Sequence, residues 1–427
     1  NIMWTSPNNY ADKQNVILAS GDLPDLMKVS ELTNSLMNQM ANQGAFWDLG
    51  PYIKNYKNLS EYPKSVMEYG KINGKQYLLP SVRPLEGAGF FAIRRDWIDK
   101  LNLKMPETMD DLYAAMDAFT NKDPDGNGKK DTLGWNTRNL WQALNVFNAS
   151  TGKYKLDNGK FADVDLEPET KLGLQWLNKA YTAKLIPEDF SVIKSTQAED
   201  MAKAGKVGLS GDTVEGIWRS TEQAKKLDPK ADFEPLVSLK GPKGAYAPRA
   251  PGFGGVYMVS KKVPEAKLKK ILELMDFGAS EEGFDLACYG IKGIHYNVDS
   301  SGFKITTEQA MKDNISQSSY GKIFERYDKY LWAIRVGMPK DVFERNKKII
   351  DQREKVSIPD NTIGLLSKTN LEVGADYSKK SDDLKIKVIM GIEPITAWDK
   401  YVEGLKADAK YMSILKEFND AYQAKKK

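Results

Sequence analysis

The segment 123–131 gives the sharpest chemical signal in the chain. Oxygen ligands recur in it at positions 1, 3, 5, 7 and 9, the spacing with which a calcium-binding EF-hand loop wraps a hard cation: Asp123, Asp125, Asn127, the carbonyl of Lys129, and Asp131. Gly128 stands at the sixth position, where such a loop turns sharply. The bidentate Glu expected at position 12 is replaced by Gly134, so a further ligand must come from Thr132, from water or from elsewhere. We predict a structural Ca²⁺ site here; an ion-free polar turn is the alternative.

Candidates for catalysis are few. The chain has one His and one Cys, so His295 would have to serve alone and Cys288 has no disulfide partner. His-based triads, two-His zinc helices and Cys-rich metal sites are therefore excluded. Cys288 lies among apolar neighbours, which predicts a buried, unreactive thiol. A pair of carboxylates for glycoside hydrolysis stays open among 58 Asp and Glu, but no segment indicates one.

Aromatic residues make up 10% of the chain and include nine Trp and twenty Tyr. Sugar faces stack on such rings, and carboxylates or amides then bond the hydroxyl groups. Trp135, Trp218 and Phe253 stand next to Gly, Asn or turn sequence and are candidates for such contacts, with core packing as the commoner alternative. Asp22, in the Gly- and Pro-containing turn 19–27, could accept hydroxyl hydrogen bonds; an ordinary helix-to-strand turn is its alternative.

The elements that position these residues alternate between strands and helices, which is typical of α/β layers. Strands are expected at 90–93, 207–210 and 256–259. Thr108 and Asp111 form a capping-box pattern before a helical apolar repeat, and similar repeats occupy 267–277 and 397–422. Two segments rich in Gly and Pro, 83–89 and 249–255, lead into expected strands and suit crossings between lobes; strand-entry loops are the alternative.

Length and charge limit the possible classes. At roughly 150 residues per domain, 427 residues indicate two large lobes or three smaller domains. The net charge of +4 shows no nucleic-acid footprint. The longest charge-free stretch, 32–47, is interrupted by Asn and Gln, so no membrane span is expected. Residues 1–5 have the pattern of a strand interior with no signal peptide before them, and we expect that the chain begins after processing or truncation.

The order and spacing of several segments resemble one known family. They are 19–25 (ASGDLPD), 73–77 followed by Leu79-Pro80, 93–101, 106–112, the loop 123–131, 290–296, and 388–391 with 398–401. Together they resemble the extracellular solute-binding proteins of bacterial ABC sugar importers, within the maltose-binding-like family. Among these, the chain is most similar to the long lipoprotein-type members of Gram-positive bacteria that serve oligosaccharide uptake.

The resemblance implies a two-lobed periplasmic-binding-protein-like α/β fold with a hinge and an interlobe ligand cleft. Residues 1–88 with 255–320 would form the N-terminal lobe, whose first strand is absent from this sequence. Residues 89–254 with 321–427 would form the C-terminal lobe, which holds the calcium loop. The expected cleft residues are Asp22, Arg83, Trp135, Asp212, Trp218 and Phe253. Arg83 would favour a uronate-bearing sugar, and a salt bridge at the hinge is its alternative.

The function that the resemblance implies is capture of an oligosaccharide and its delivery to a membrane-embedded ABC permease, without catalysis. The implied protein is a monomer, located outside the cell on a lipid anchor or in a periplasm. Two other classes stay open from the residues alone: a polysaccharide-active enzyme, and a calcium-dependent surface adhesin for carbohydrate.

Overall fold

The structure is a computed structural model that describes residues 2–3, 5, 9–29, 35–315 and 323–426. The chain forms two compact units, each made from two separate stretches: unit 1 comprises Asn1–Leu85 and Pro251–Leu331, and unit 2 comprises Glu86–Ala250 and Trp332–Lys427. The first two crossings lie within a few residues of the expected boundaries at 88 and 254. The boundary expected at 320 lies in 316–322, outside the described residues, and the change of unit follows Leu331.

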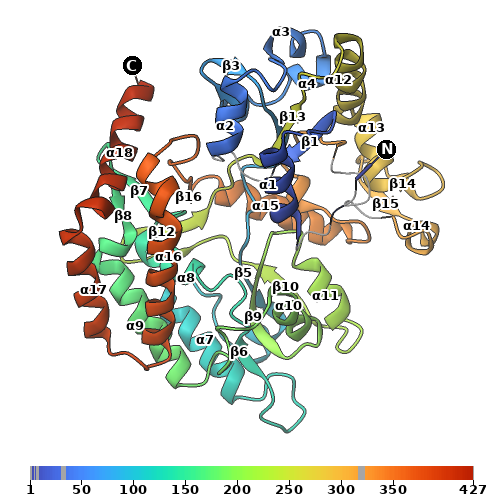
Figure 1. The fold of residues 1–427 in the computed structure, drawn as a ribbon. Helices are drawn as coiled ribbons and strands as arrows, with labels where there is room; N and C mark the ends of the chain where they lie inside the picture. Colours follow the sequence, from blue (N-terminus) through green and yellow to red (C-terminus); the bar gives the residue numbers. More distant parts are fainter. Residues whose placement is uncertain (1, 4, 6–8, 30–34, 316–322, 427) are drawn as a thin grey trace. The chain divides into compact units, whose positions relative to one another are not determined.

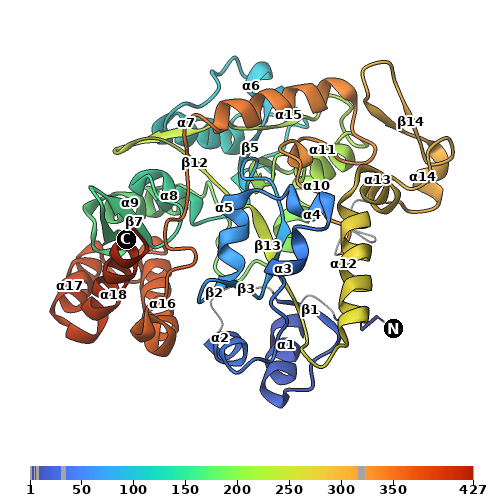
Figure 2. The same ribbon diagram turned by 90° about the horizontal axis from the view of Figure 1, so that it is seen from above.

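Unit 1 combines a small sheet with short helices (Figure 1). In chain order its elements are α1 (Tyr10–Ser20), β1 (Leu26–Val29), α2 (Ser35–Asn42), α3 (Gly50–Ile53), α4 (Lys57–Ser60), α5 (Lys64–Met67), β2 (Lys71–Ile72), β3 (Lys75–Gln76), β4 (Leu79–Val82), β13 (Phe253–Val259), α12 (Glu265–Ala279), α13 (Glu281–Tyr289), β14 (Tyr296–Val298), β15 (Lys304–Thr306) and α14 (Glu308–Lys312). Helix α12 runs alongside α4, and the Asp276 carboxylate accepts the backbone N–H groups of Asn58 and Leu59 (Figure 2).

The sheet of unit 1 has the strand order β1-β13-β4, with both pairings antiparallel. Its middle strand therefore comes from the second stretch of the unit, while both outer strands come from the first. The register shifts between Phe253 and Val256, where Gly255 has φ +116°. A bulge of this kind places a glycine where other residues would be strained.

Unit 2 is larger and consists of residues 86–250 and 332–427. Its elements are β5 (Phe90–Arg94), α6 (Arg95–Lys100), α7 (Met109–Asn121), β6 (Leu133–Trp135), α8 (Gln142–Asn148), β7 (Tyr154–Asp157), β8 (Lys160–Asp163), α9 (Pro168–Thr182), α10 (Ser195–Lys203), β9 (Val207–Asp212), α11 (Trp218–Ala224), β10 (Phe233–Pro235), β11 (Leu239–Gly241), β12 (Gly244–Pro248), α15 (Lys340–Arg353), β16 (Ser357–Ile358), α16 (Lys368–Ile389), α17 (Ile395–Ala407) and α18 (Ala409–Lys426).

The main sheet of unit 2 has the order β10-β5-β9-β6, in which only β6 and β9 are parallel. Strand β5 is buried along its whole length, so its residues 90–94 read as a continuous apolar run until Arg94. Helix α7 packs over this sheet and begins with the predicted capping box, in which Thr108 and Asp111 bond each other's backbone N–H groups. The sheet ends at Asp212, opposite Phe90, where the chain enters the unit.

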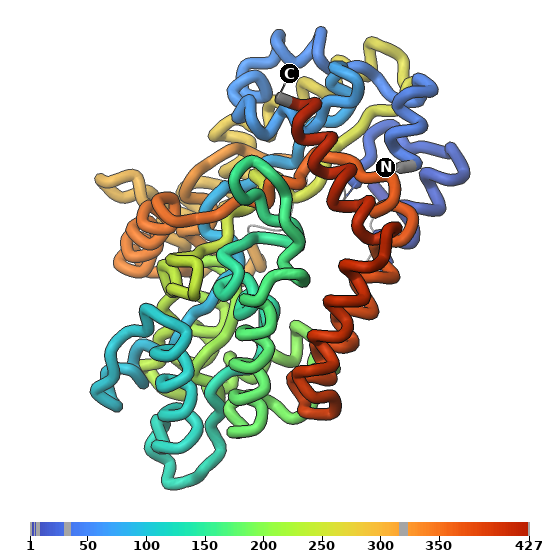
Figure 3. The backbone as a smooth tube through the Cα atoms, turned by 90° about the vertical axis from the view of Figure 1, so that its left-hand side faces the viewer, coloured from blue at the N-terminus to red at the C-terminus, as the bar shows by residue number. Residues whose placement is uncertain are grey.

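The C-terminal helices α16–α18 lie beside the segment that contains α9 (Figure 3). A buried polar group fastens them to it: the Asp165 carboxylate accepts bonds from Ser381 and Lys385 of α16, at 2.8 Å each. Tyr411 of α18 donates to Asp163, which neighbours Asp165 in sequence. Burial raises the pKa of Asp163 to about 6. These contacts join helices to a hairpin more than two hundred positions away.

Most expected elements are confirmed. The strands predicted at 90–93, 207–210 and 256–259 lie within β5, β9 and β13, and the helix predicted at 267–277 lies within α12. The helical region 397–422 is divided, because Asp408 leaves the helical conformation and accepts the N–H groups of Lys410 and Tyr411. The described residues of 1–5 form no strand. None of the helices that the structure describes has the length and apolar character needed to cross a membrane.

We predict that Gly255→Ala destabilises the protein while Gly254→Ala does not. A Cβ at Gly255 would lie 2.6 Å from the Val29 carbonyl oxygen, whereas a Cβ at Gly254 meets only the Arg83 side chain at 3.5 Å. With the strained φ added, the cost at Gly255 should be about 2–4 kcal/mol, measured by urea unfolding. Equal stability of the two variants would show that β13 can be inserted without this bulge.

Candidate functional site

Arg83 follows β4 and belongs to a buried ion-pair group in unit 1. Its guanidinium lies 3.0 Å from the Glu325 carboxylate and also donates to the Val82 carbonyl. Lys28 of β1 lies 3.3 Å from the same Glu325 oxygen, and the Ser81 hydroxyl donates to it at 2.7 Å. Glu325 is only 3% exposed, so its charge depends on these partners. The group ties the 323–331 stretch to β1 and β4, which explains why unit 1 extends to Leu331.

Phe253 and Tyr69 form a half-buried aromatic pair next to this group. Their ring centroids are 5.4 Å apart with the planes inclined by 50°. The Arg83 side chain passes within reach of Gly254, so the cation and the rings are neighbours on one surface of unit 1. Such a combination of ring faces with a guanidinium matches the chemistry of sugar recognition.

Asp22 lies apart from that surface. It is exposed in the turn between α1 and β1, and β1 pairs there with the Val259 end of β13. Phe253 and Arg83 lie at the opposite end of the same sheet, because Phe253 pairs with Val82. Within unit 1 the structure therefore brings Arg83 and Phe253 together, and places Asp22 at the other end of the strands.

Asp212 is the centre of a charged group in unit 2. Arg138 and Arg219 both approach the same carboxylate oxygen of Asp212, each to 2.9 Å, and the Asp212 side chain is 10% exposed. Glu199 of α10 lies 3.5 Å from Arg138 and 3.3 Å from Arg219, so two arginines and two carboxylates alternate. The loop after Asp212 is fastened to the crossing segment, since Val214 donates its N–H to the Gly87 carbonyl.

Glu215 stands next to this group and titrates near neutral pH. Burial, and after it the charge of Asp212, raises the pKa of Glu215 to about 7, although Arg335 and Arg219 lower it in part. The Thr213 hydroxyl donates to the Glu215 carboxylate at 3.0 Å. Glu215 therefore changes its charge beside the Asp212 group in the physiological pH range.

Trp135 and Trp218 are both buried in unit 2. Trp135 of β6 is fully enclosed, with its ring edge-on to Phe91 at 5.4 Å. Trp218 begins α11 and is 5% exposed. The structure thus places Trp218 in the same loop-to-helix segment as Asp212, while Trp135 is part of the hydrophobic core beneath the neighbouring strand.

The loop 123–131 has the turns that its sequence predicts. Gly126 and Gly128 both adopt positive φ, and the Asp123 carboxylate accepts the N–H groups of Gly126, Asn127 and Gly128. These bonds, with the Gly128 N–H first, lower the pKa of Asp123. The oxygen side chains share one short loop, which fits a hard cation in chemistry. In the described residues, however, no three His, Cys, Asp or Glu side chains converge as a ready-made metal site.

The ammonium group of the Lys206 side chain lies against this loop. Lys206 directly precedes β9, and its ammonium group is 2.6 Å from an Asp131 oxygen and 3.5 Å from an Asp125 oxygen. The Asn127 amide also donates to both carboxylates. The hydrogen bond from Lys206 is the main cause of the lowered pKa of Asp131. The loop thus attracts positive charge in this structure, as a calcium loop must.

Two further features bear on catalysis. Burial raises the pKa of the Cys288 thiol to about 12, which confirms the prediction of a buried cysteine and leaves it protonated at neutral pH. The His295 ring accepts the Ile291 N–H, and it bonds Asp313, which follows α14 in unit 1, at 3.0 Å.

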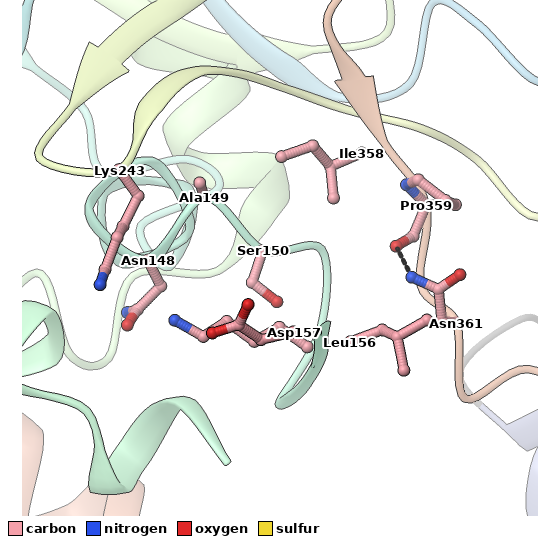
Figure 4. Close-up of a pocket in the computed structure, with 10 residues that line it drawn as sticks. Asn148, Ala149, Ser150, Leu156, Asp157, Lys243, Ile358, Pro359 and Asn361 are labelled. Atoms are coloured by element: carbon pink, nitrogen blue, oxygen red, sulfur yellow. Dashed lines mark hydrogen bonds between the residues drawn. The ribbon is translucent and has the colours of Figure 1, made fainter. Parts of the chain in front are cut away.

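A pocket of about 240 Å³ lies between α8, β7 and the segment after β16, all in unit 2. Figure 4 shows the side chains of Asn148, Ser150, Asp157 and Lys243 extending toward a common space. Lys243 is held there by Glu169 at 3.1 Å. No aromatic ring lines this pocket, so it lacks the stacking surface that the Phe253–Tyr69 pair offers.

Most partners of the candidate residues come from segments that the sequence patterns did not indicate. Around Asp212 these are Arg138, Glu199, Glu215 and Arg219; around Arg83 and Phe253 they are Lys28, Tyr69 and Glu325. Most of them lie far along the chain from the residue that they contact. Only Glu215 and Arg219 lie within seven positions of Asp212. The charged residues that follow the end of the strand were the one local pattern that could have indicated them.

Comparison with known proteins identifies the family. The profile of bacterial extracellular solute-binding proteins matches residues 1–283, and the chain belongs to this family. Lipoprotein LipO of Bacillus subtilis (strain 168) is 28% identical, with 100% of this chain and 86% of LipO covered. The polygalacturonan/rhamnogalacturonan-binding protein YtcQ of the same organism is 30% identical, again with 100% of this chain and 86% of YtcQ covered.

A solved structure supports the same fold. The Streptococcus pneumoniae ABC-transporter substrate-binding protein FusA, in complex with kestose, matches with a TM-score of 0.72 at 20% identity, covering 100% of this chain and 93% of FusA. A FusA EF-hand mutant in complex with fructo-nystose matches with a TM-score of 0.69. The solute-binding-protein fold predicted from the sequence is therefore confirmed.

We predict that Glu215→Gln flattens the pH dependence of stability between about pH 4.5 and 7. In the folded protein Glu215 holds its proton to about pH 7, whereas the unfolded chain loses it near 4.5. The folded state thus binds more protons in this window, so wild-type stability falls as pH rises through it. Gln keeps the shape of the side chain without ionising. Between pH 5 and pH 8, wild type should therefore lose about 1–3 kcal/mol more of its free energy of unfolding than the variant loses.

Urea unfolding at pH 5 and pH 8 measures this difference. Glu188→Gln is the control, because Glu188 is exposed and its Lys184 partner is exposed as well. If wild type and Glu215→Gln lose the same stability between the two pH values, Glu215 ionises as an ordinary surface carboxyl.

Proposed function

We propose that this protein captures an oligosaccharide and delivers it to an ABC permease, with uronic-acid-containing chains as the first candidates. The observation that carries the proposal is the 30% identity to the polygalacturonan/rhamnogalacturonan-binding YtcQ along all of this chain. The FusA likeness extends it to a sugar-binding component of an ABC transporter.

The geometry of each unit supports sugar binding. Unit 1 has the Phe253–Tyr69 rings for stacking and Arg83 beside them. Unit 2 has Asp212 with Arg138 and Arg219, a set that can bond several hydroxyl or carboxyl groups. That the two sets act on one ligand stays a prediction from the resemblance.

The proposed role is binding without turnover. The carboxylates of the Asp212 group are engaged by arginines, which suits hydrogen bonding to a ligand more than proton transfer. Glu215, whose pKa is about 7, is the exception and could act as an acid or base. A polysaccharide-active enzyme could use it as a catalytic acid, and analysis of the recovered sugar decides between binding and turnover.

The proposed partners follow from the same family. The permease is a membrane complex outside this chain, the protein itself acts as a monomer, and its location is the cell surface on a lipid anchor or a periplasm. LipO, by name, is a lipoprotein.

We predict that one class of oligosaccharide raises the thermal midpoint of the protein. A ligand at a hundred times its dissociation constant adds about 2.7 kcal/mol to the folded state. A thermal-shift screen should compare oligogalacturonides, fructo-oligosaccharides and neutral galacto-oligosaccharides. Phe253→Ala should weaken binding of the active sugar about tenfold through lost stacking, whereas Phe161→Leu, in the separate C-terminal helix core, should not. The absence of any shift with all three classes contradicts oligosaccharide capture.

We also propose that the 123–131 loop binds Ca²⁺ as a structural ion. The oxygen atoms of Asp123, Asp125, Asn127 and Asp131 and the Lys129 carbonyl would hold it. The supporting observations are the positive φ of Gly128 and the attraction of Lys206 to the same carboxylates. The ion would supply positive charge to the loop and restrain its turns.

We predict that Lys206→Gln raises calcium affinity about tenfold and lowers the thermal midpoint measured in chelator. The variant removes a cation that competes with Ca²⁺ for Asp131 and Asp125 and that also stabilises the loop without the ion. Isothermal titration with CaCl₂ and thermal unfolding in EDTA measure the two effects. Lys130→Gln is the control, because Lys130 is exposed in the same loop. Unchanged affinity and midpoint in Lys206→Gln would rule out this competition.

A further inference from the structure

A cavity of about 620 Å³ opens in unit 2 between α10 and α11, and we call it the α10–α11 pocket. Its charged lining consists of four cations and two carboxylates: Lys203, Arg219, Lys226, Arg335, Asp200 and Glu222. Cations in such a wall that have no carboxylate partner of their own attract anions and favour an anionic occupant. The volume is ample for one sugar ring with its substituents.

Two of these cations are fixed parts of the wall. The Lys203 ammonium group lies 3.0 Å from a Glu199 oxygen, and the Arg219 guanidinium lies 3.3 Å from the same oxygen. Arg219 also reaches Asp212 at 2.9 Å. Their charges are largely balanced by these neighbours, so they shape the pocket and connect it to the Asp212 group.

Arg335 and Lys226 are different. Within the part of the chain that the structure describes, neither forms an ion pair, and both line the cavity. Arg335 is half-buried, so its guanidinium has lost part of its water while Glu215 acts on it only at longer range. A guanidinium in this state gains most from a carboxylate, which it can bind through two parallel hydrogen bonds. Lys226 is exposed at the rim and adds attraction from a distance.

We infer that the α10–α11 pocket binds the carboxylate of a uronic-acid unit, with Arg335 as the bidentate donor. This inference rests on the proposed capture of an oligosaccharide and specifies the charge of that sugar and the residues that recognise it. The connection through Arg219 places the pocket next to the Asp212 group, so a chain bound there can extend one acidic unit into it.

Isothermal titration with trigalacturonate and with neutral galactotriose tests the inference. Arg335→Gln should weaken trigalacturonate binding about 10- to 100-fold and leave galactotriose binding unchanged. Lys226→Gln should weaken it about 2- to 5-fold, and the effect should vanish in 500 mM NaCl because an exposed charge is screened. Lys230→Gln is the control, since Lys230 is exposed and does not line the pocket. A thermal midpoint within about 2 °C of wild type shows that each variant is folded.

The outcomes separate the two proposals. If wild type binds trigalacturonate and both Arg335→Gln and Lys226→Gln bind it equally well, the pocket inference is wrong while oligosaccharide capture stands. Binding of neutral oligosaccharides without trigalacturonate likewise overturns the pocket alone. If inorganic phosphate competes as strongly as trigalacturonate, the pocket takes anions in general and recognition of a uronate is contradicted. No binding of any oligosaccharide by wild type overturns both proposals.

Discussion

The insertion of β13 between β1 and β4 is the contact on which the rest of the structure depends. The outer strands of this sheet come from residues 26–29 and 79–82, and the middle strand from 253–259. Unit 1 can therefore close only after the chain has passed through most of unit 2 and returned. The register shift at Gly255 lies between this middle strand and β4, and Phe253 at the start of β13 pairs with Val82.

In each unit, one buried carboxylate bonds residues close to the points where the chain crosses to the other unit. In unit 1 Glu325 accepts Lys28, Ser81 and Arg83. In unit 2 Glu86, which is 2% exposed, accepts the Ser357 hydroxyl and pairs with Arg249 at 3.3 Å. A buried carboxylate is costly unless its partners stay in place, so each group specifies where the chain leaves its unit. The Glu325 group also holds Arg83 near the Phe253–Tyr69 pair, which gives the proposed sugar surface a rigid base.

The sequence predicted the local features well. The capping box at Thr108, the apolar run of β5 and the turns of the 123–131 loop depend on residues close together in the chain, and all three are present. Partners that come from distant segments could not be predicted from the sequence. Glu325 is 242 positions from Arg83, and Lys206 is 75 positions from Asp131, so no local pattern connects them. Trp135 shows the converse limit, since its neighbouring Gly and Asn suggested a surface position and the strand pairing buried it.

The central claim is that the protein binds one oligosaccharide reversibly and leaves it intact. The most direct measurement is isothermal titration with the most stabilising oligosaccharide, followed by chromatography of the sugar recovered after prolonged incubation. The account predicts saturable binding of one sugar per protein and recovery of the sugar at its original length. Shortened products would contradict it and turn attention to Glu215 as a catalytic acid, and a titration without saturable binding would contradict it as well.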